Sequence, residues 1–498
     1  MSSRVTINRL ATGVPGLDEV LGGGLPEFSF NLIAGPPGCG KTTLAHQMMC
    51  SMATPERPAL YLTVLGEPPL KMLRYQQQFE FFDAEQVKKA IHFVNLSDET
   101  LAGDLNRVLR RISAEVESIN PSFVYVDSFR SVVTAHHGAS EGSSPAQLQQ
   151  FVQELGMLMT GWQATTFLMG EYFTEIDANP VCTVADGLIW MRQSVQRNSM
   201  VRKLEVMKMR GQATLPGLHS FRIGAQGITA VAPARAVDSP NASPGAPTAD
   251  SRLLNGVARL DKMLGGGLPR GYSLLVAGPS GSGKSILASA FLEEGVRVGE
   301  NGVIAVFERR PTRGRTPALA ELVQSGRVGV VDTHSPDLSI GEVVLLLTSE
   351  IRRLGAKRIV IDSLSGFELA LAPTFRDDFR ESLARMVTAL LASGVTVLMT
   401  SELEDRYSDL RFSPYGTAFL TDAIVVKRYI EDERRLPRMM AVVKVRASAH
   451  SNELREFTID DGGLHVGDML LGHEGLLGGR PKPHARGEVP RATDRACA

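Results

Sequence analysis

The stretch SFNLIAGPPGCGKTTLA, residues 29–45, decides the fold of the chain, because it joins an apolar run to a helical pattern through a glycine-rich loop. The loop fits the pattern GxxxxGK followed by Ser or Thr. Its glycines let successive backbone N–H groups converge on phosphate oxygens, and the N-terminus of the following helix faces the same charge. The signature recurs in SLLVAGPSGSGKSILA, residues 273–288. Two copies, each between a strand and a helix, predict two nucleotide-binding P-loops rather than glycine-rich turns without a ligand.

Each loop assigns residues to ATP and to Mg²⁺. Lys41 and Lys284 are expected to reach the β- and γ-phosphates and to take part in catalysis, and Thr42 and Ser285 are expected to ligate Mg²⁺. The loop residues predicted to bind ATP are Gly35, Pro36, Pro37, Gly38, Cys39, Gly40, Lys41, Thr42 and Thr43 in the first copy, and Gly278, Pro279, Ser280, Gly281, Ser282, Gly283, Lys284, Ser285 and Ile286 in the second.

The loops belong to a longer duplication. RLATGVPGLDEVLGGGLP, residues 9–26, aligns without gaps with RLLNGVARLDKMLGGGLP, residues 252–269, at the same offset as the two loops. Such a long period indicates two homologous domains and not a solenoid. A segment rich in Pro, Ala and Ser separates the halves and predicts a linker, and Gly, Pro and Arg dominate the C-terminal end and predict a disordered tail. The predicted boundaries are domains 1–232 and 251–468, linker 233–250 and tail 469–498.

Composition limits the classes of function. The 498 residues are 43% hydrophobic and 21% charged, as in ordinary globular domains. With 53 Lys plus Arg against 54 Asp plus Glu, the chain carries no global charge that would favour nucleic acid or a membrane as partner. The four cysteines lack zinc-site spacing, and neither a signal peptide nor an apolar run of about 18 residues is present. We therefore expect a cytoplasmic protein.

Short apolar runs alternate with helical patterns in both halves. ALYLTVL, FVYVD and TTFLM in the first half correspond to VIAVF, IVIDS and TVLMT in the second. Runs that are apolar on both faces and separated by helices predict an α/β fold with a mainly parallel sheet covered on both sides. The later segments AIVVKRYI and MMAVVKVRA alternate more and predict an antiparallel hairpin.

Two aspartates at strand ends and two glutamates are the remaining candidates for metal binding and for activation of water. Asp127 closes FVYVD and Asp362 closes IVID, where a P-loop protein needs an acid for the metal, although such a residue also commonly just ends a strand. Hydrolysis also needs a group that orients or deprotonates water. Glu308 ends the strand after the second P-loop helix, whereas Glu67 of LYLTVLGEPP is displaced by one position and would point to the other face. The catalytic interpretation of Glu308 is favoured, and the alternative is that it is simply a surface charge.

With these residues placed, the chain resembles the KaiC family of double-domain, RecA-like ATPases of the circadian clock and related bacterial proteins. The opening TG-x-x-x-LD-x-x-LGGG-LP and the tetrad Lys208-Met209-Arg210-Gly211 are typical of that family. The resemblance runs from about residue 5 to 468 and implies two tandem RecA-like domains per chain, a hexameric double ring and ATP at subunit interfaces. It implies that Lys208 and Arg210, and in the second half Lys444 and Arg446, contact the phosphates of a neighbouring subunit's ATP; otherwise they are solvated strand charges.

The sequence departs from the family pattern at two places. Of the family's tandem glutamates, the second half keeps the first, Glu308, and has Arg309 next to it. In the first half, an alignment at Pro69 puts Gly66-Glu67 in the two places, and an alignment at Pro68 puts Leu65-Gly66 there and loses both glutamates. Hydrolysis in the first half could therefore be slow or altered. The family's autokinase activity modifies a Ser-Thr pair before a Thr-Asp. Ala418-Phe419 stands there, so the usual phosphosite is absent, while Thr417 and Thr421 remain nearby.

The leading hypothesis is an oligomeric Mg·ATP hydrolase whose nucleotide state controls assembly and the binding of signalling partners. An autokinase with a non-standard phosphosite is a second possibility. A third is DNA recombination, as in RecA and RadA, but no helix-hairpin-helix, zinc module or basic stripe with interleaved aromatics supports it. A fourth is a scaffold gated by ATP binding alone, at least in the first half.

Overall fold

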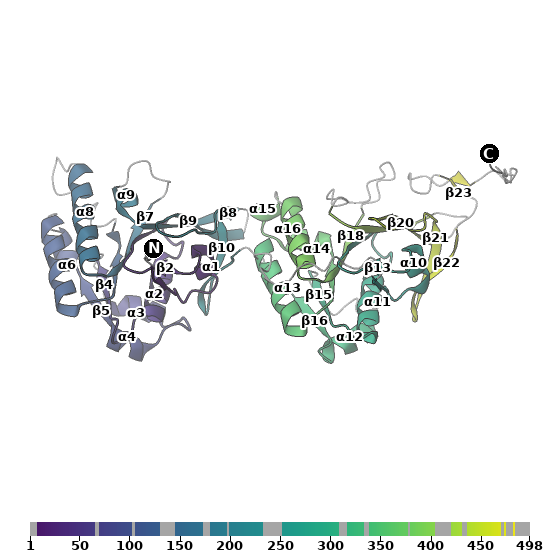
Figure 1. Ribbon diagram of the computed structural model, residues 1–498, viewed down its shortest axis with the longest axis horizontal. Helices are drawn as coiled ribbons and strands as arrows, with labels where there is room; N and C mark the ends of the chain where they lie inside the picture. The colour runs from purple at the N-terminus through teal and green to yellow at the C-terminus, as the bar shows by residue number, and fades with distance from the viewer. Residues whose placement is uncertain are drawn as a thin grey trace, which may run out of the picture. The chain divides into compact units, whose positions relative to one another are not determined.

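The computed structural model of the chain describes residues 7–64, 69–101, 105–129, 145–172, 180–196, 199–232, 251–307, 316–332, 338–376, 379–403, 420–430, 436–469, 473–474 and 482–483. The chain divides into two compact units, Met1–Pro233 and Ala234–Ala498 (Figure 1). The predicted linker, residues 233–250, lies outside the described residues.

A nine-stranded sheet with strand order β11-β10-β9-β8-β3-β7-β6-β4-β5 forms the centre of the first unit. The strands from β8 through β3 to β5 pair in parallel, and β8 to β11 pair antiparallel. The predicted mainly parallel sheet is therefore confirmed. The strands are β3 (Phe30–Gly35), β4 (Ala59–Thr63), β5 (Ile91–Asn95), β6 (Phe123–Asp127), β7 (Thr165–Glu171), β8 (Gly187–Gln196), β9 (Ser199–Met209), β10 (His219–Gly224) and β11 (Gly227–Ala230).

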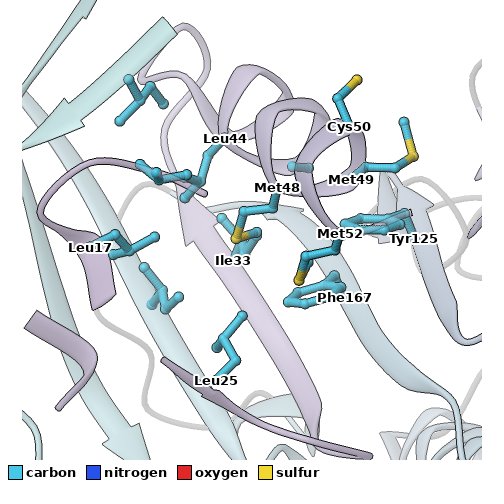
Figure 2. Packing of buried hydrophobic residues seen from close by; sticks show 14 of the residues in the cluster. Leu17, Leu25, Ile33, Leu44, Met48, Met49, Cys50, Met52, Tyr125 and Phe167 are labelled. Carbon is cyan, nitrogen blue, oxygen red and sulfur yellow. The ribbon is translucent and has the colours of Figure 1, made fainter. Parts of the chain in front are cut away.

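Helices cover both faces of this sheet, because its strands are apolar on both faces. Along β3, Ile33 packs in the cluster that contains Met48 of α2, and Leu32 packs in the opposite cluster with α6 and α8. Figure 2 shows Met48 and Met52 of α2 lying over the sheet residues of the first cluster. The helices are α1 (Leu17–Leu21), α2 (Lys41–Met52), α3 (Pro69–Gln76), α4 (Ala84–Ala90), α5 (Ser97–Leu101), α6 (Leu105–Ile119), α8 (Pro145–Gly161) and α9 (Pro180–Val184).

The second unit repeats this topology with strand order β16-β15-β17-β18-β14-β19-β20-β21-β22. Its P-loop strand β14 again lies between β18 and the strand that starts the antiparallel part, β19, and the predicted hairpin of β19 and β20 is confirmed. The strands are β14 (Ser273–Gly278), β15 (Gly302–Val306), β16 (Val328–Asp332), β17 (Arg358–Asp362), β18 (Thr396–Glu402), β19 (Ala423–Tyr429), β20 (Arg438–Val445), β21 (Arg455–Asp460) and β22 (Gly463–Met469).

The second sheet also carries an apolar cluster on each face. Val276 packs in the cluster with Phe291 of α11, and Leu275 packs in the cluster with Leu347 of α13 and Leu390 of α16. The prediction of two tandem α/β domains is confirmed. The helices are α10 (Ala258–Met263), α11 (Lys284–Arg297), α12 (Pro317–Gln324), α13 (Ile340–Leu354), α14 (Leu364–Ala370), α15 (Pro373–Arg376) and α16 (Phe379–Ala392).

Three small antiparallel pairs complete the described structure. In each unit a strand pair precedes the P-loop strand, and a third pair lies within the C-terminal segment 469–498. Among the described helices, none is both long and apolar enough to cross a membrane. The pairs are β1 (Arg9–Leu10) with β2 (Leu25–Pro26), β12 (Arg252–Leu253) with β13 (Leu268–Pro269), and β23 (His473–Glu474) with β24 (Lys482–Pro483).

Candidate nucleotide-binding sites

Both predicted loops connect the central strand of a sheet to the N-terminus of a buried helix. The last two glycines of each loop have positive φ: 75° and 106° at Gly38 and Gly40, and 74° and 76° at Gly281 and Gly283. A Cβ atom at Gly40 would lie 2.7 Å from Ile223 Cδ1, so the loop lies directly against the antiparallel strands. Only glycine fits such positions without strain, which explains the glycine spacing of the motif.

The two motif lysines lie over their own loops. Lys41 Nζ donates hydrogen bonds to the carbonyl oxygens of Gly35 and Pro36, at 3.0 and 2.9 Å. Lys284 Nζ donates to the equivalent carbonyls of Gly278 and Pro279, both at 2.8 Å. Each lysine side chain thus lies beside a helix N-terminus, where the phosphates of a nucleotide are favoured.

In the first unit the structure brings the two predicted Mg²⁺ ligands together. Asp127 ends β6, which is separated from β3 by β7, and its Oδ2 accepts a hydrogen bond from Thr42 Oγ1 at 3.0 Å. The hydroxyl of Tyr61 on β4 donates to the same oxygen at 2.8 Å. Burial raises the pKa of the Asp127 carboxyl, and the hydrogen bonds from Tyr61 and Thr42 oppose this rise. A hydroxyl next to a carboxylate is an oxygen donor set that suits Mg²⁺.

In the second unit the predicted acid has a different partner. Asp362 ends β17, and its Oδ1 accepts a hydrogen bond of 2.5 Å from Thr400 Oγ1 on the intervening strand β18. Within the described residues, Ser285 and Asp362 share no hydrogen bond. The peptide bond that follows the aspartate is cis in both units. The two sites therefore have the same backbone arrangement but hold their acids with different side chains.

Sequence reasoning missed one acid beside each P-loop. Glu171 ends β7 in register with Gly35, and Glu402 ends β18 in register with Gly278. The strand that each glutamate ends lies between the P-loop strand and the strand that ends in Asp127 or Asp362. The sequence did contain a signal for these two glutamates, because each follows an apolar run that was predicted as a strand. Tyr61 and Thr400 gave no such signal, since their roles depend on pairing between distant strands.

The candidate water-activating glutamates, Glu67 and Glu308, both lie outside the described residues. The preceding strands end beside the predicted metal ligands, with Thr63 paired to Asp127 and Val306 paired to Asp362. The role of both glutamates stays a prediction.

The predicted phosphate-contacting cations lie at the far end of the sheet from the loop of their own unit. Leu188 of β8 pairs with Lys208, and β8 runs parallel to the P-loop strand with Gly187 opposite Asn31 at its start. Arg210 Nη1 is 3.1 Å from Asp186 Oδ1, and the other oxygen of Asp186 accepts the N–H of Phe30, the first residue of β3. The loop begins at the opposite end of that strand.

The second unit repeats this arrangement. Arg446 pairs with Asp422 at 3.2 Å, and Asp422 accepts the N–H of Ser273, the first residue of β14. Lys444 Nζ donates to the carbonyl of Thr421 at 2.7 Å. Burial lowers the pKa of Lys444, as it does for Lys208. The cations of a unit are therefore about a strand length, four to five residues or roughly 15 Å, from its own loop.

A cavity of about 400 Å³ lies on the flank of α11, immediately beyond the second loop. Its lining includes Ile286, Ala290 and Glu293 of the helix, and Glu293 accepts a hydrogen bond from Thr316 at 2.7 Å. Residues 462–466, from the end of the turn after β21 and the first part of β22, also line it. The equivalent of Ala290 in the first unit is Gln47, whose side chain bonds both backbone groups of Ile228.

Comparison with known proteins gives two consistent results. A family model described as "ATPase: KaiC" matches residues 10–235 and again residues 254–470. The circadian clock protein KaiC3 of Synechocystis sp. is 27% identical to the chain over 504 residues, which cover 97% of both proteins. The circadian clock oscillator protein KaiC of Picosynechococcus sp. is 26% identical over 489 residues, 95% of this chain and 92% of that protein. The same-named protein of Prochlorococcus marinus is 24% identical over 494 residues, 96% of this chain and 97% of that protein.

Proposed function

The chain belongs to the KaiC family of ATPases, and on that basis we propose that it binds Mg·ATP at both P-loops and hydrolyses it at interfaces between identical subunits. The observation that carries the proposal is the pairing of Thr42 with Asp127 beside a loop whose lysine lies over the helix N-terminus. These groups can hold a polyphosphate and its metal in one place. Bound Mg²⁺ would neutralise charge on the β- and γ-phosphates.

Each residue has a role in this proposal. Lys41 and Lys284 neutralise phosphate charge, and the hydroxyls of Thr42 and Ser285 act with Asp127 and Asp362 as metal ligands. Glu308, and Glu67 in the first unit, are proposed to orient or deprotonate the attacking water. The cavity beside α11 in the second unit would accommodate the nucleoside, since it begins at Ile286, directly after Ser285.

The positions of the strand cations support assembly into a ring. Arg210 and Arg446 lie too far from their own loops to contact the nucleotide bound there, yet their side chains are 60% and 56% exposed. A head-to-tail contact between chains can bring these cations to the nucleotide of a neighbour, and such a contact closes into a ring when its rotation fits. We propose a homohexamer with ATP at the interfaces, in which bound nucleotide favours assembly by mass action and signalling partners read the nucleotide state.

The two units are proposed to divide the work. The first unit pairs Thr42 with Asp127 beside its loop lysine, but its candidate glutamate is displaced by one residue in the sequence. The second unit has Glu308 at the expected place. We therefore propose that ATP at the first unit mainly holds the assembly together and that the second unit supplies most of the turnover.

Two variants test this proposal. Lys41→Ala and Lys284→Ala each remove one P-loop cation from the full-length chain. Lys41→Ala is expected to impair assembly, measured by light scattering after chromatography with ATP and Mg²⁺. Lys284→Ala is expected to leave assembly intact and to lower ATP turnover at least tenfold, a loss of about 1.4 kcal/mol of transition-state stabilisation. Equal losses of turnover with intact assemblies would contradict the division of work, and unchanged turnover in both variants would contradict the proposed site.

Autophosphorylation is a second candidate activity, favoured by the position of Thr421 at the edge that carries Lys444. The Thr421 side chain is fully buried, so it would have to become exposed before accepting a phosphoryl group. Thr417 lies outside the described residues. Mass spectrometry after incubation with Mg·ATP tests this activity: phosphate on either threonine supports it, and an unmodified chain contradicts it.

A further inference from the structure

A buried lysine lies beneath the second P-loop and is absent from the motif. Lys427 of β19 has no solvent exposure, and its Nζ donates a hydrogen bond of 2.8 Å to the carbonyl oxygen of Gly283. The same ammonium group lies 5.1 Å from the centre of the Phe457 ring on β21. Lys427 is thus held between the loop and the antiparallel strands.

No carboxylate acts on Lys427 in the described part of the chain. The charged groups that act on it are Lys284 at the start of α11 and Arg438 on β20. Tyr429, two residues further along β19, hydrogen-bonds through its hydroxyl to the carbonyl of Ser280 in the loop. Burial, together with these two cations, lowers the pKa of Lys427 well below its usual value. A lysine in such surroundings is costly unless an anion offsets it.

The first unit shows that the fold does not require this lysine. Trp190 pairs with Ala34 as Val426 pairs with Ala277, so Met191 is the counterpart of Lys427. Phe221 and Ile223 of β10 take the places of Phe457 and Ile459, and the counterpart of Arg438 is Arg202. The buried lysine under the loop is therefore a feature of the second unit.

A single peptide group, between Gly283 and Lys284, connects Lys427 to the phosphate-binding loop. The carbonyl of Gly283 belongs to the peptide bond whose N–H is that of Lys284, the first residue of α11. This N–H is one of the donors of a helix N-terminus, which face a bound phosphate. A hydrogen bond to the carbonyl polarises the peptide and strengthens the donor at its other end.

We propose that Lys427 is a positioning residue of the second nucleotide site, which strengthens binding of nucleoside triphosphate there and takes up a proton when the nucleotide binds. The inference rests on the proposed binding of ATP at this loop. The negative charge of the triphosphate offsets the repulsion from Lys284 and Arg438, so the charged form of Lys427 is favoured in the complex. The first site, with Met191, lacks this coupling.

The sign of the pH dependence follows. Nucleotide raises the pKa of Lys427, so a proton is taken up at pH values between the pKa of the free site and that of the complex. Affinity is then highest below this window and falls as pH rises through it, by up to about tenfold for each pH unit. A purely structural lysine would give no proton uptake on binding.

Calorimetry on the full-length chain tests the proposal. The Lys41→Ala chain leaves only the second loop intact, and the Lys284→Ala chain leaves only the first. Each is titrated with Mg²⁺ and a non-hydrolysable ATP analogue between pH 6.5 and 9, in buffers with different ionisation enthalpies, which gives the protons taken up. We expect extra proton uptake only at the second site. Equal uptake at both sites would overturn the inference, and absence of binding to both the Lys41→Ala chain and the Lys284→Ala chain would overturn the proposed function instead.

Introducing Lys427→Met into the Lys41→Ala chain tests whether Lys427 is the residue that takes up the proton. Methionine is the residue that the first unit has at this position, so a similar packing is expected. The variant should bind the analogue about tenfold more weakly near pH 7 and take up no extra proton. Unchanged affinity and proton uptake would overturn the role of Lys427. If the variant does not fold, the comparison of the two sites in chains with an intact Lys427 still decides the question.

Discussion

Two adjacent buried tyrosines in the first unit differ in whether their hydroxyl groups have partners. Tyr61 and Tyr125 stack at 6.3 Å, and neither side chain is exposed. The Tyr61 hydroxyl donates to Asp127, whereas the Tyr125 hydroxyl has no hydrogen-bond partner among the described residues. A hydrogen bond to a carboxylate stabilises a fold, and an unsatisfied buried hydroxyl costs free energy.

This pair gives a matched test at the residue scale. Tyr61→Phe is expected to lower the free energy of unfolding of the first unit by about 2 kcal/mol, because it removes a bond to a buried carboxylate. Tyr125→Phe removes no bond and should leave the stability unchanged or raise it slightly. Both tryptophans, Trp162 and Trp190, belong to the first unit, so urea unfolding followed by tryptophan fluorescence reports on it alone. Equal losses in the two variants would show that the bond to Asp127 does not stabilise the unit.

The residues of the P-loops could be predicted from sequence, because their roles depend on local spacing. Lys41 and Lys284 lie over their loops as the motif requires. Tyr61, Thr400 and Lys427 could not be identified, since each acts across strands that are distant in sequence. Burial was the missing information for Lys427: a lysine in a strand is usually assigned to a solvated face, and in this strand it points under the loop.

At the scale of elements, the P-loop helices differ in how they contact the antiparallel hairpin at the edge of the sheet. In the first unit, Gln47 of α2 bonds the backbone N–H and C=O of Ile228 on β11 and so attaches the hairpin to the helix. In the second unit, Ala290 of α11 leaves a cavity between the helix and the turn before β22. The side chain at this one helix position therefore differs between the units. Glutamine in the first unit contacts the hairpin, and alanine in the second unit leaves a cavity.

A larger side chain at this position tests whether the cavity holds the nucleoside. Ala290→Gln should weaken binding of ATP to the second site about tenfold, because glutamine would occupy the cavity. Binding of inorganic tripolyphosphate should not change, since it lacks a nucleoside. Affinities are measured by calorimetry in the Lys41→Ala chain, and Val298→Gln at the exposed end of α11 is the control. If Ala290→Gln weakens both ligands equally, or neither, the nucleoside does not bind in this cavity.

The strands were the elements most readily predicted. SFNLIA, FVYVD and TVLMT form β3, β6 and β18, because runs that are apolar on both faces need a sheet covered on both sides. The order of the strands was not predictable from these runs. The insertion of β7 and β18 between the P-loop strand and the aspartate strand brings Glu171 and Glu402 to the loops, and only the paired structure reveals this.

At the scale of the whole molecule, the duplication gives each chain two loops and two sets of cations that cannot meet within a unit. Arg446 pairs with Asp422 beside the start of β14, and Lys444 donates to the neighbouring Thr421 carbonyl. The P-loop, in contrast, follows the end of β14. Under the proposed function, another copy of the chain would supply these cations to the nucleotide bound at the loop.

Mixing two defective chains tests this completion. A chain with Arg446→Ala keeps the second P-loop, and a chain with Lys284→Ala keeps Arg446. If Arg446 acts on the nucleotide of a neighbour, each chain alone should lose most of the second-unit turnover. Co-assembled in equal amounts, they should recover roughly a quarter of it, because about one interface in four then joins an intact loop to an intact arginine. The first P-loop is intact in both chains, so ATP-dependent assembly is preserved and any turnover of the first unit is the same in all samples.

The control mixture pairs Lys284→Ala with the double variant Lys284→Ala and Arg446→Ala, which has no intact second loop and should show only first-unit turnover. Recovery in the first mixture above this level requires that residues of two chains form one site, because no single chain contains both groups. If the first mixture stays at the control level while light scattering shows mixed assemblies, Arg446 does not act across the interface. Its pairing with Asp422 would then be a contact within the subunit, and the two ends of the sheet would have separate roles.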